Sequence, residues 1–315
     1  MQGWKLGIVA LMMPALGLVS TARAAEPDSC KAVRFSDVGW TDITATTATA
    51  SAILKALGYA PTTTVLSVPV TYTSLKNKQI DVFLGNWMPT MEGDRKSYVD
   101  DKSVDVIRPN LEGAKYTLAV PQYVYDAGLK SFADIAKFKD KLDGKIYGIE
   151  PGNDGNRLIL GMIKDDRFGL NSFNIVESSE QGMLSQVERA TKRNEPIVFL
   201  GWEPHPMNTK FKLAYLTGGD DVFGPNYGGA TVYTNERAHY AADCPNAGKF
   251  IGNLKFSLPM ENQIMGSILF DDQDAGKAAT DWLKANPAVL DDWLAGVTTF
   301  DGQPGLPAVK KSLGL

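Results

Sequence analysis

The 315-residue chain has little cysteine and histidine and no excess of basic charge. Its 2 Cys and 2 His leave few side chains for histidine-based catalysis or for a cluster of soft metal ligands. With 32 basic and 36 acidic residues the formal net charge is −4, whereas a nucleic-acid binder carries a basic excess. We therefore expect no nucleic-acid partner, no metal site and no cofactor.

Motifs of enzymes are also missing from the chain. It has no phosphate-binding loop, no GxGxxG dinucleotide pattern and no serine elbow. Asp42 and Glu203 could be imagined as the carboxylate pair of a glycoside hydrolase, but nothing in their spacing requires it. We predict that the chain is not an enzyme.

A long apolar run occurs only at the start of the chain. A short basic region is followed by an apolar stretch over residues 6–19 and by the pattern Ala22-x-Ala24, which fits a cleavage site. Pro14 interrupts the run, which is shorter than the about 20 residues needed to span a bilayer. We predict that residues 1–24 are a cleaved signal peptide and that the mature chain is exported and soluble.

Export changes how the two cysteines are interpreted, because disulfides persist in an oxidising compartment. We expect Cys30 and Cys244 to pair, with two unrelated free thiols as the alternative. The bridge would tie the start of the mature chain to a segment deep in its second half. The chain would then leave its first lobe and later return to it.

Short β-branched and aromatic runs alternate with helical patterns along the mature chain, which predicts an α/β fold. The expected strands are residues 32–37, 64–68, 81–84, 115–120, 145–149, 174–177, 196–200, 212–216 and 230–234. The expected helices are residues 44–57, 131–139, 156–164, 181–193 and 245–254, followed by a largely helical C-terminal part. Strands near Lys115 and Lys212 are the expected crossings between two lobes. We predict a discontinuous lobe 1 of residues 25–112 and 215–315, and a lobe 2 of residues 113–214.

Three tryptophans share one kind of position in the chain. Trp40, Trp87 and Trp202 each come shortly after an apolar strand and a glycine. Ligands of open α/β sheets bind at the carboxyl ends of the strands, so three such rings are candidates for one pocket. Tyr116, at the first expected crossing, is a fourth candidate.

Several aromatic faces around a small cavity suit either a sugar, by stacking, or a quaternary ammonium group, by cation–π attraction. A sugar needs many paired donors and acceptors, whereas a trimethylammonium group needs only ring faces and an anion. Asp42 can supply that anion, or it can cap the helix expected at residues 44–57. Asn153, in the turn at residues 150–156, can bind a ligand hydroxyl or carboxylate, or it can cap the next helix. His205 lies between two prolines, and we interpret it as part of a fixed loop rather than a pocket wall.

Four segments carry a family resemblance: residues 35–42 (FSDVGWTD), 81–89 (DVFLGNWMP), 148–153 (GIEPGN) and 199–205 (FLGWEPH). Together with WLKANP at residues 282–287, they closely resemble the periplasmic choline-binding proteins of bacterial ABC transporters, within the glycine betaine/choline binding family. The resemblance covers essentially the whole mature chain.

The resemblance implies a two-lobed periplasmic binding protein of type II, which closes on a ligand in the cleft between its lobes. The family's ligand-site positions match Trp40, Asp42, Trp87, Tyr116, Asn153 and Trp202. It implies that the aromatic residues form a box for the trimethylammonium group, with the aspartate as counter-charge and the asparagine on the ligand hydroxyl. It also implies a monomer in the periplasm that delivers its ligand to the permease subunits of an ABC importer.

The residues also separate choline from glycine betaine. The carboxylate of betaine would need a cationic or multiply donating partner, and Asp42 would repel it. Among the loop positions above, no lysine or arginine occurs except Lys115 beside Tyr116. We therefore predict choline as the ligand, with glycine betaine or another trimethylammonium compound as the alternative and a sugar as the less favoured one.

Overall fold

The structure, a computed structural model, describes residues 26–315, so the predicted signal peptide lies outside the described residues. The described strands are β1 (Ala32–Asp37), β2 (Ala60–Val65), β3 (Val82–Met88), β4 (Val104–Pro121), β5 (Lys145–Tyr147), β6 (Asn174–Val176), β7 (Phe199–Glu203), β8 (Leu213–Tyr215) and β9 (Gly229–Arg237). They form one sheet in the order β2-β1-β3-β9-β4-β7-β5-β6, with β8 paired to β4. The predicted α/β class is confirmed.

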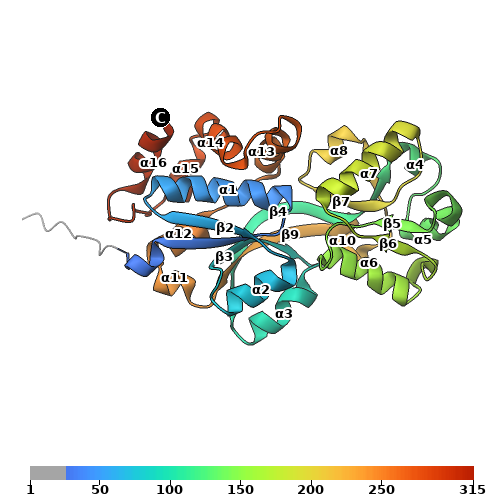
Figure 1. Ribbon diagram of the computed structural model, residues 1–315, viewed down its shortest axis with the longest axis horizontal. Helices are drawn as coiled ribbons and strands as arrows, with labels where there is room; N and C mark the ends of the chain where they lie inside the picture. The colour runs from blue at the N-terminus through green and yellow to red at the C-terminus, as the bar shows by residue number, and fades with distance from the viewer. Residues whose placement is uncertain (1–25) are drawn as a thin grey trace, which may run out of the picture.

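The elements gather into two groups that lie side by side along the long axis of the molecule (Figure 1). The first lobe contains β1, β2 and β3 with the helices α1 (Thr41–Ala56), α2 (Val68–Lys76), α3 (Glu92–Asp100), α11 (Tyr240–Asp243), α12 (Pro245–Asn253), α13 (Leu258–Phe270), α14 (Ala275–Ala285), α15 (Val289–Trp293) and α16 (Gly305–Leu313). The second lobe contains β5, β6, β7 and β8 with the helices α4 (Gln122–Asp126), α5 (Phe132–Ile135), α6 (Asp154–Lys164), α7 (Glu180–Arg193), α8 (Met207–Lys210), α9 (Asp220–Phe223) and α10 (Pro225–Gly228). Within residues 26–315, no helix has the length and apolar character that crossing a membrane demands.

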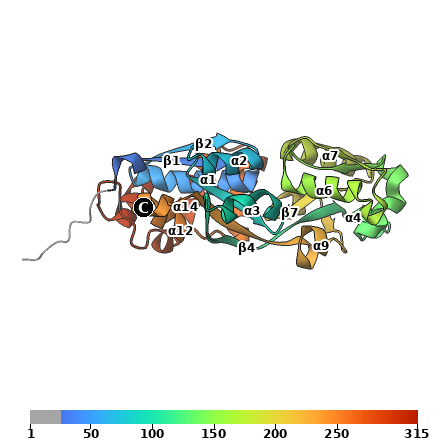
Figure 2. The same ribbon diagram turned by 90° about the horizontal axis from the view of Figure 1, so that it is seen from below.

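Two long strands, β4 and β9, connect the lobes, and the view from below shows β4 passing from one to the other (Figure 2). They pair antiparallel from Val104 opposite Arg237 to Lys115 opposite Gly229. β8, in the segment predicted as the return crossing, instead pairs with Ala119–Pro121 at the second-lobe end of β4. The return crossing therefore lies on β9, while the residue bounds predicted for the two lobes stay a prediction.

Strand direction brings the ends of β1 and β3 to the same edge of the first lobe. β1 pairs parallel with both β2 and β3. Parallel neighbours need a crossover helix, and α1 and α2 supply it between successive strands. Because carboxyl ends of parallel strands share an edge, the residues that follow β1 and end β3 meet there. The corresponding strand ends of the second lobe face this edge of the first lobe.

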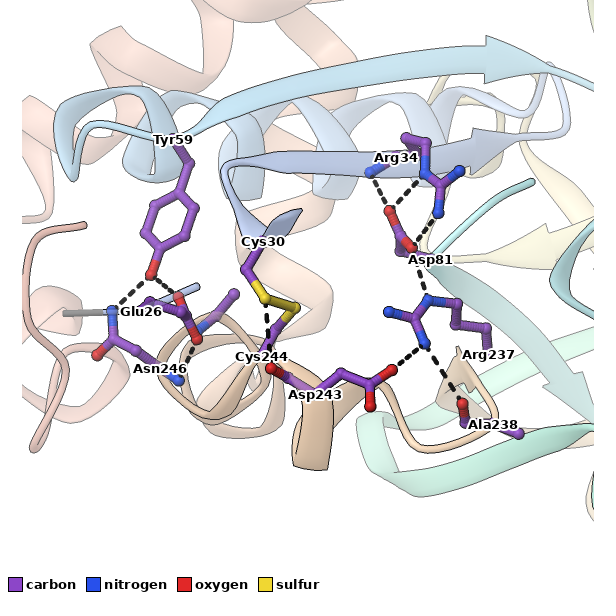
Figure 3. The surroundings of a disulfide bond; sticks show 11 residues. Glu26, Cys30, Arg34, Tyr59, Asp81, Arg237, Ala238, Asp243, Cys244 and Asn246 are labelled. Atoms are coloured by element: carbon purple, nitrogen blue, oxygen red, sulfur yellow. Dashed lines mark hydrogen bonds and ion pairs between the residues drawn. A yellow bond between two sulfur atoms is a disulfide. The ribbon is translucent and has the colours of Figure 1, made fainter. Parts of the chain in front are cut away.

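The predicted disulfide is present and ties two distant segments of the first lobe. Cys30 precedes β1, Cys244 precedes α12, and their Cα atoms are 5.5 Å apart. Close to the bridge, the buried Asp81 carboxylate accepts hydrogen bonds from Arg34 and Arg237 (Figure 3). Ion pairs as well as the disulfide therefore hold this end of the first lobe together. This end lies away from the second lobe (Figure 1).

Candidate ligand-binding site

A small pocket lies where the two lobes meet. The residues that line it are Trp40, Asp42, Trp87, Tyr116, Ile149 and Trp202. None of these residues is more than 5% exposed. The structure thus brings together five of the six ligand residues predicted from the sequence, and it adds Ile149, which has no signal in the sequence beyond its place at a strand end.

Three of the four rings owe their position to strands, and the fourth to a helix start. Tyr116 on β4 lies directly opposite Trp202 on β7 in the antiparallel register. Trp87 is near the end of β3, and Trp40 immediately precedes α1. The ring of Tyr116 meets Trp87 at 62° and Trp202 at 82°, with centroids 6.0 and 6.2 Å apart. Both contacts are edge-to-face rather than stacked.

Asp42 lines this space and has one carboxyl oxygen without a hydrogen-bond partner. Its Oδ2 accepts a hydrogen bond from Trp87 Nε1 at 3.1 Å, while its buried Oδ1 has no hydrogen-bond partner in the protein. Burial raises the pKa of the Asp42 carboxyl to about 8, and the nearby Glu180 adds to the rise. The alternative interpretation of Asp42 as a helix cap is wrong, because Trp40 holds the N-cap position of α1 and Asp42 lies inside its first turn.

Asn153 caps a helix and supports one of the rings. It is the N-cap of α6, where its Oδ1 accepts a hydrogen bond from Asn156 N at 3.1 Å. The same oxygen accepts from the Tyr116 hydroxyl at 2.8 Å. Asn153 lies outside the set of lining residues, so its capping role is confirmed and its contact with a ligand hydroxyl stays a prediction.

Contacts across the cleft involve carboxylates that the sequence did not single out. Trp40 Nε1 donates to Glu150 Oε1 at 2.8 Å, and burial raises the pKa of Glu150 to about 7. Thr41 donates to Glu180, at the start of α7, from both its backbone nitrogen and its hydroxyl. Glu150 lies in the predicted turn and Glu180 at the edge of a predicted helix, but their partners come from the other lobe. Local sequence carries no signal for such contacts.

The chemistry of the cavity favours a small cation without N–H groups. None of the six lining residues is basic, four are aromatic, and one is Asp42, whose Oδ1 has no hydrogen-bond partner. A cation–π box binds an ammonium ligand through the negative ring faces and needs no hydrogen bonds to it. Fold and site together define a two-lobed binding protein that encloses a small cationic ligand between its lobes.

Comparison with known proteins gives the family. Residues 31–285 match the substrate-binding domain of the ABC-type glycine betaine transport system, and the chain belongs to this family. The members of the family are binding components of transport systems, so the chain is a substrate-binding protein rather than an enzyme. The family assigned from the sequence motifs is thereby confirmed.

Solved structures of similar proteins share the fold. An ABC-transporter choline-binding protein in complex with choline is 67% identical, with a TM-score of 0.91 over 92% of this chain and 100% of that chain. An ABC-transporter choline-binding protein in an unliganded semi-closed conformation, also 67% identical, gives 0.84 over 91% and 100%. Lactococcal OpuAC, closed on glycine betaine, is 26% identical, with a TM-score of 0.76 over 83% and 98%. The predicted two-lobed binding-protein fold is confirmed.

Proposed function

We propose that this chain binds choline in the cavity between its lobes and delivers it to the permease subunits of an ABC importer. The observation that carries the proposal is the set of four rings that line one pocket with Asp42, whose buried Oδ1 has no hydrogen-bond partner. A trimethylammonium group would contact the ring faces, and its positive charge would offset the buried carboxylate. The similar structure bound to choline supports the same ligand chemistry.

The energetics require both the rings and the enclosed cleft. Four cation–π contacts at roughly 0.5–2 kcal/mol each give about 2–8 kcal/mol. Micromolar binding needs about 8 kcal/mol after association has cost about 4 kcal/mol or more. The rings alone fall short of that sum. The Asp42 carboxylate, in a site from which water is excluded, supplies the remaining attraction.

Glycine betaine is the second candidate, because the matched family and lactococcal OpuAC are described by that ligand. Its carboxylate would meet Asp42 and no basic lining residue. Lys115 is engaged elsewhere, since its Nζ lies 3.4 Å from Glu203 and over the ring of Tyr215. Choline, which carries a hydroxyl in place of the carboxylate, avoids this repulsion.

The remaining roles belong to the same proposal. Asn153, held beside Tyr116, would bind the choline hydroxyl. The mature chain would act as a monomer in the periplasm after removal of residues 1–24. The two lobes would close on the ligand by rotating about the strands that connect them.

Titration of the mature chain tests the proposal. Choline, glycine betaine and a disaccharide are added separately, while heat and tryptophan fluorescence are recorded. We expect saturable binding of choline, weaker binding of betaine and no binding of the disaccharide. Tight betaine binding without choline binding would assign the cavity to the second candidate, and tight sugar binding alone would refute both.

A further inference from the structure

One buried carboxylate, that of Glu180, accepts hydrogen bonds from both lobes. Its side chain is 0% exposed and belongs to the first turn of α7 in the second lobe. Thr41, in the first lobe, donates its backbone N–H to Oε2 at 2.8 Å and its hydroxyl to Oε1 at 2.5 Å. His205, in the second lobe, lies with Nε2 at 3.2 Å from Oε1.

The contact supplies a helix cap that α1 does not provide for itself. The first N–H groups of any helix lack partners within it, and a side chain at the N-cap usually accepts from one of them. At α1 the N-cap is Trp40, whose side chain makes no capping hydrogen bond. Glu180 instead binds the N–H of Thr41, the first residue of the helix. A carboxylate at this place also interacts favourably with the positive end of the helix dipole. The second lobe therefore caps a helix of the first.

The position of Thr41 makes this cap relevant to the ligand. Thr41 lies between Trp40 and Asp42, two of the residues that line the cavity. Holding the first turn of α1 against the second lobe therefore also holds the orientations of the Trp40 ring and the Asp42 carboxyl group.

In the second lobe, Glu180 contacts His205, which packs against the cavity residue Trp202. His205 Nδ1 accepts a hydrogen bond from Met207 N at 2.9 Å, so Nε2 is the nitrogen that carries a proton and donates to Glu180. The imidazole packs edge-on against Trp202, with ring centroids 4.9 Å apart. His205 is buried behind the box and does not line the cavity, which agrees with the fixed-loop interpretation.

An ion pair across the cleft is more exposed than the Glu180 contact. Arg157 on α6 pairs with Asp94 on α3 at 2.7 Å, and its side chain is 43% exposed. An exposed pair of this kind is screened by solvent and contributes little. Hydrogen bonds to a buried carboxylate are stronger, and each unpaired donor left behind is costly. Compared with this ion pair, the Glu180 contact is thus the stronger candidate for holding the lobes together.

We propose that Glu180 is the latch of the closed form: a positioning residue that caps α1 across the cleft only when the lobes are closed, and so slows release of the ligand. This inference rests on the proposed function, because the ligand used to test it is choline. It assigns to Glu180 no contact with the ligand itself.

The Glu180→Gln variant tests the latch with little change in shape. All three partners of the carboxylate are donors, so an amide leaves one of them facing an NH₂ group. We expect choline affinity to fall about 10- to 100-fold, mainly through faster dissociation in stopped-flow fluorescence. The melting temperature of the ligand-free variant should stay close to that of the wild type, because the contact forms only on closure. Glu188→Gln, on the exposed face of the same helix, is the matched control and should bind choline like the wild type.

A double-mutant cycle with Thr41 separates the latch from a general structural effect. Thr41→Val removes the hydroxyl and should weaken choline binding. Thr41→Ser keeps the hydroxyl and should bind choline like the wild type. In the Glu180→Gln background, Thr41→Val should cost much less than it does alone. Additive effects, or a Glu180→Gln variant that binds choline as tightly as Glu188→Gln, would refute the latch. Failure of the wild type to bind choline would instead refute the proposed function.

Discussion

At the scale of single residues, the site is dominated by carboxyl groups that water does not reach. Glu261 on α13 is fully buried, and its pKa is raised well above the usual range by burial and by the neighbouring Asp42. Glu180 raises the pKa of Asp42 in the same way. A bound cation stabilises the ionised forms of several acids that repel one another in a site without water. A bound anionic group would destabilise them. A bound cation would therefore favour the ionised forms of Asp42 and Glu261, which burial disfavours.

This arrangement predicts that choline binding depends on pH. The pKa of Asp42 in the ligand-free site is raised to about 8, so the group is mostly protonated below that pH. Choline favours the ionised form, and protons therefore compete with it. We expect affinity to rise with pH, by up to about tenfold per unit, and to level off above pH 8.

Calorimetry between pH 5.5 and 9 measures the effect, with Asp42→Asn as the comparison. That variant should bind choline more weakly and should lose most of the pH dependence. The part that remains should reflect Glu150, whose pKa is raised to about 7. A wild-type affinity that stays constant over this range would show that Asp42 is not the counter-charge.

Removing one ring should weaken binding without unfolding the protein. Trp87→Ala and Trp202→Ala each delete a box wall, and we expect each to lower choline affinity by about tenfold or more, the loss of one strong cation–π contact. Trp282→Ala, on α14 of the first lobe and outside the cavity lining, is the control and should leave affinity unchanged. Unchanged affinity in either box variant would exclude that ring from the site.

At the scale of secondary-structure elements, close packing of α6 against β4 sets the position of Tyr116. A Cβ atom added at Gly155, in the first turn of α6, would lie 2.1 Å from the Tyr116 hydroxyl and 3.0 Å from Leu200. Gly155 therefore leaves the room in which Tyr116 reaches Asn153. The glycine is needed because of the ring, and not because of the backbone conformation of the helix.

The Gly155→Ala variant should consequently push Tyr116 out of place. We expect choline affinity to fall about tenfold or more, as for the loss of a ring. Gly161→Ala on the same helix is the matched control, because no atom lies within 4 Å of the added Cβ and alanine favours the helix. Equal affinities of the two variants would mean that the packing at Gly155 does not position the ring.

Elements with a continuous apolar pattern could be predicted from the sequence, and interrupted ones could not. The bounds of β1 were predicted correctly, because its alternation is uninterrupted. β4 extends back to Val104, beyond its predicted start at residue 115, because Pro109 and Gly113 interrupt the strand pattern of that part. Within the site, rings after strand ends were found because a strand end is a local signal. Glu150 and Glu180 were missed because their partners become neighbours only when the lobes meet.

At the scale of the whole molecule, the disulfide and the cavity lie at different ends of the first lobe. The bridge closes a sequence separation of 214 residues at the end that lies away from the second lobe. It therefore constrains the unfolded chain without touching the ligand. Stability and binding should respond separately when it is removed.

The double variant Cys30→Ala, Cys244→Ala tests this separation. We expect the free energy of unfolding, measured with urea, to fall by about 2–5 kcal/mol. Choline affinity at a temperature well below unfolding should stay within about twofold of the wild type. A large loss of affinity in a folded variant would show that the bridge controls closure of the cleft.

Binding of choline should change how far the two lobes are closed. The described conformation joins the lobes through Trp40 to Glu150 and Thr41 to Glu180, and it resembles the choline-bound structure with a TM-score of 0.91 against 0.84 for the unliganded one at the same sequence identity. Each cross-cleft bond would separate in an open form, where water would replace the partner. Choline, by filling the cavity, should shift the population toward the closed form. Small-angle scattering should therefore show a smaller radius of gyration with choline than without it, and Asp42→Asn should need higher choline concentrations for the same change. Saturation detected by heat with no change in radius would mean that the lobes are already closed before the ligand arrives.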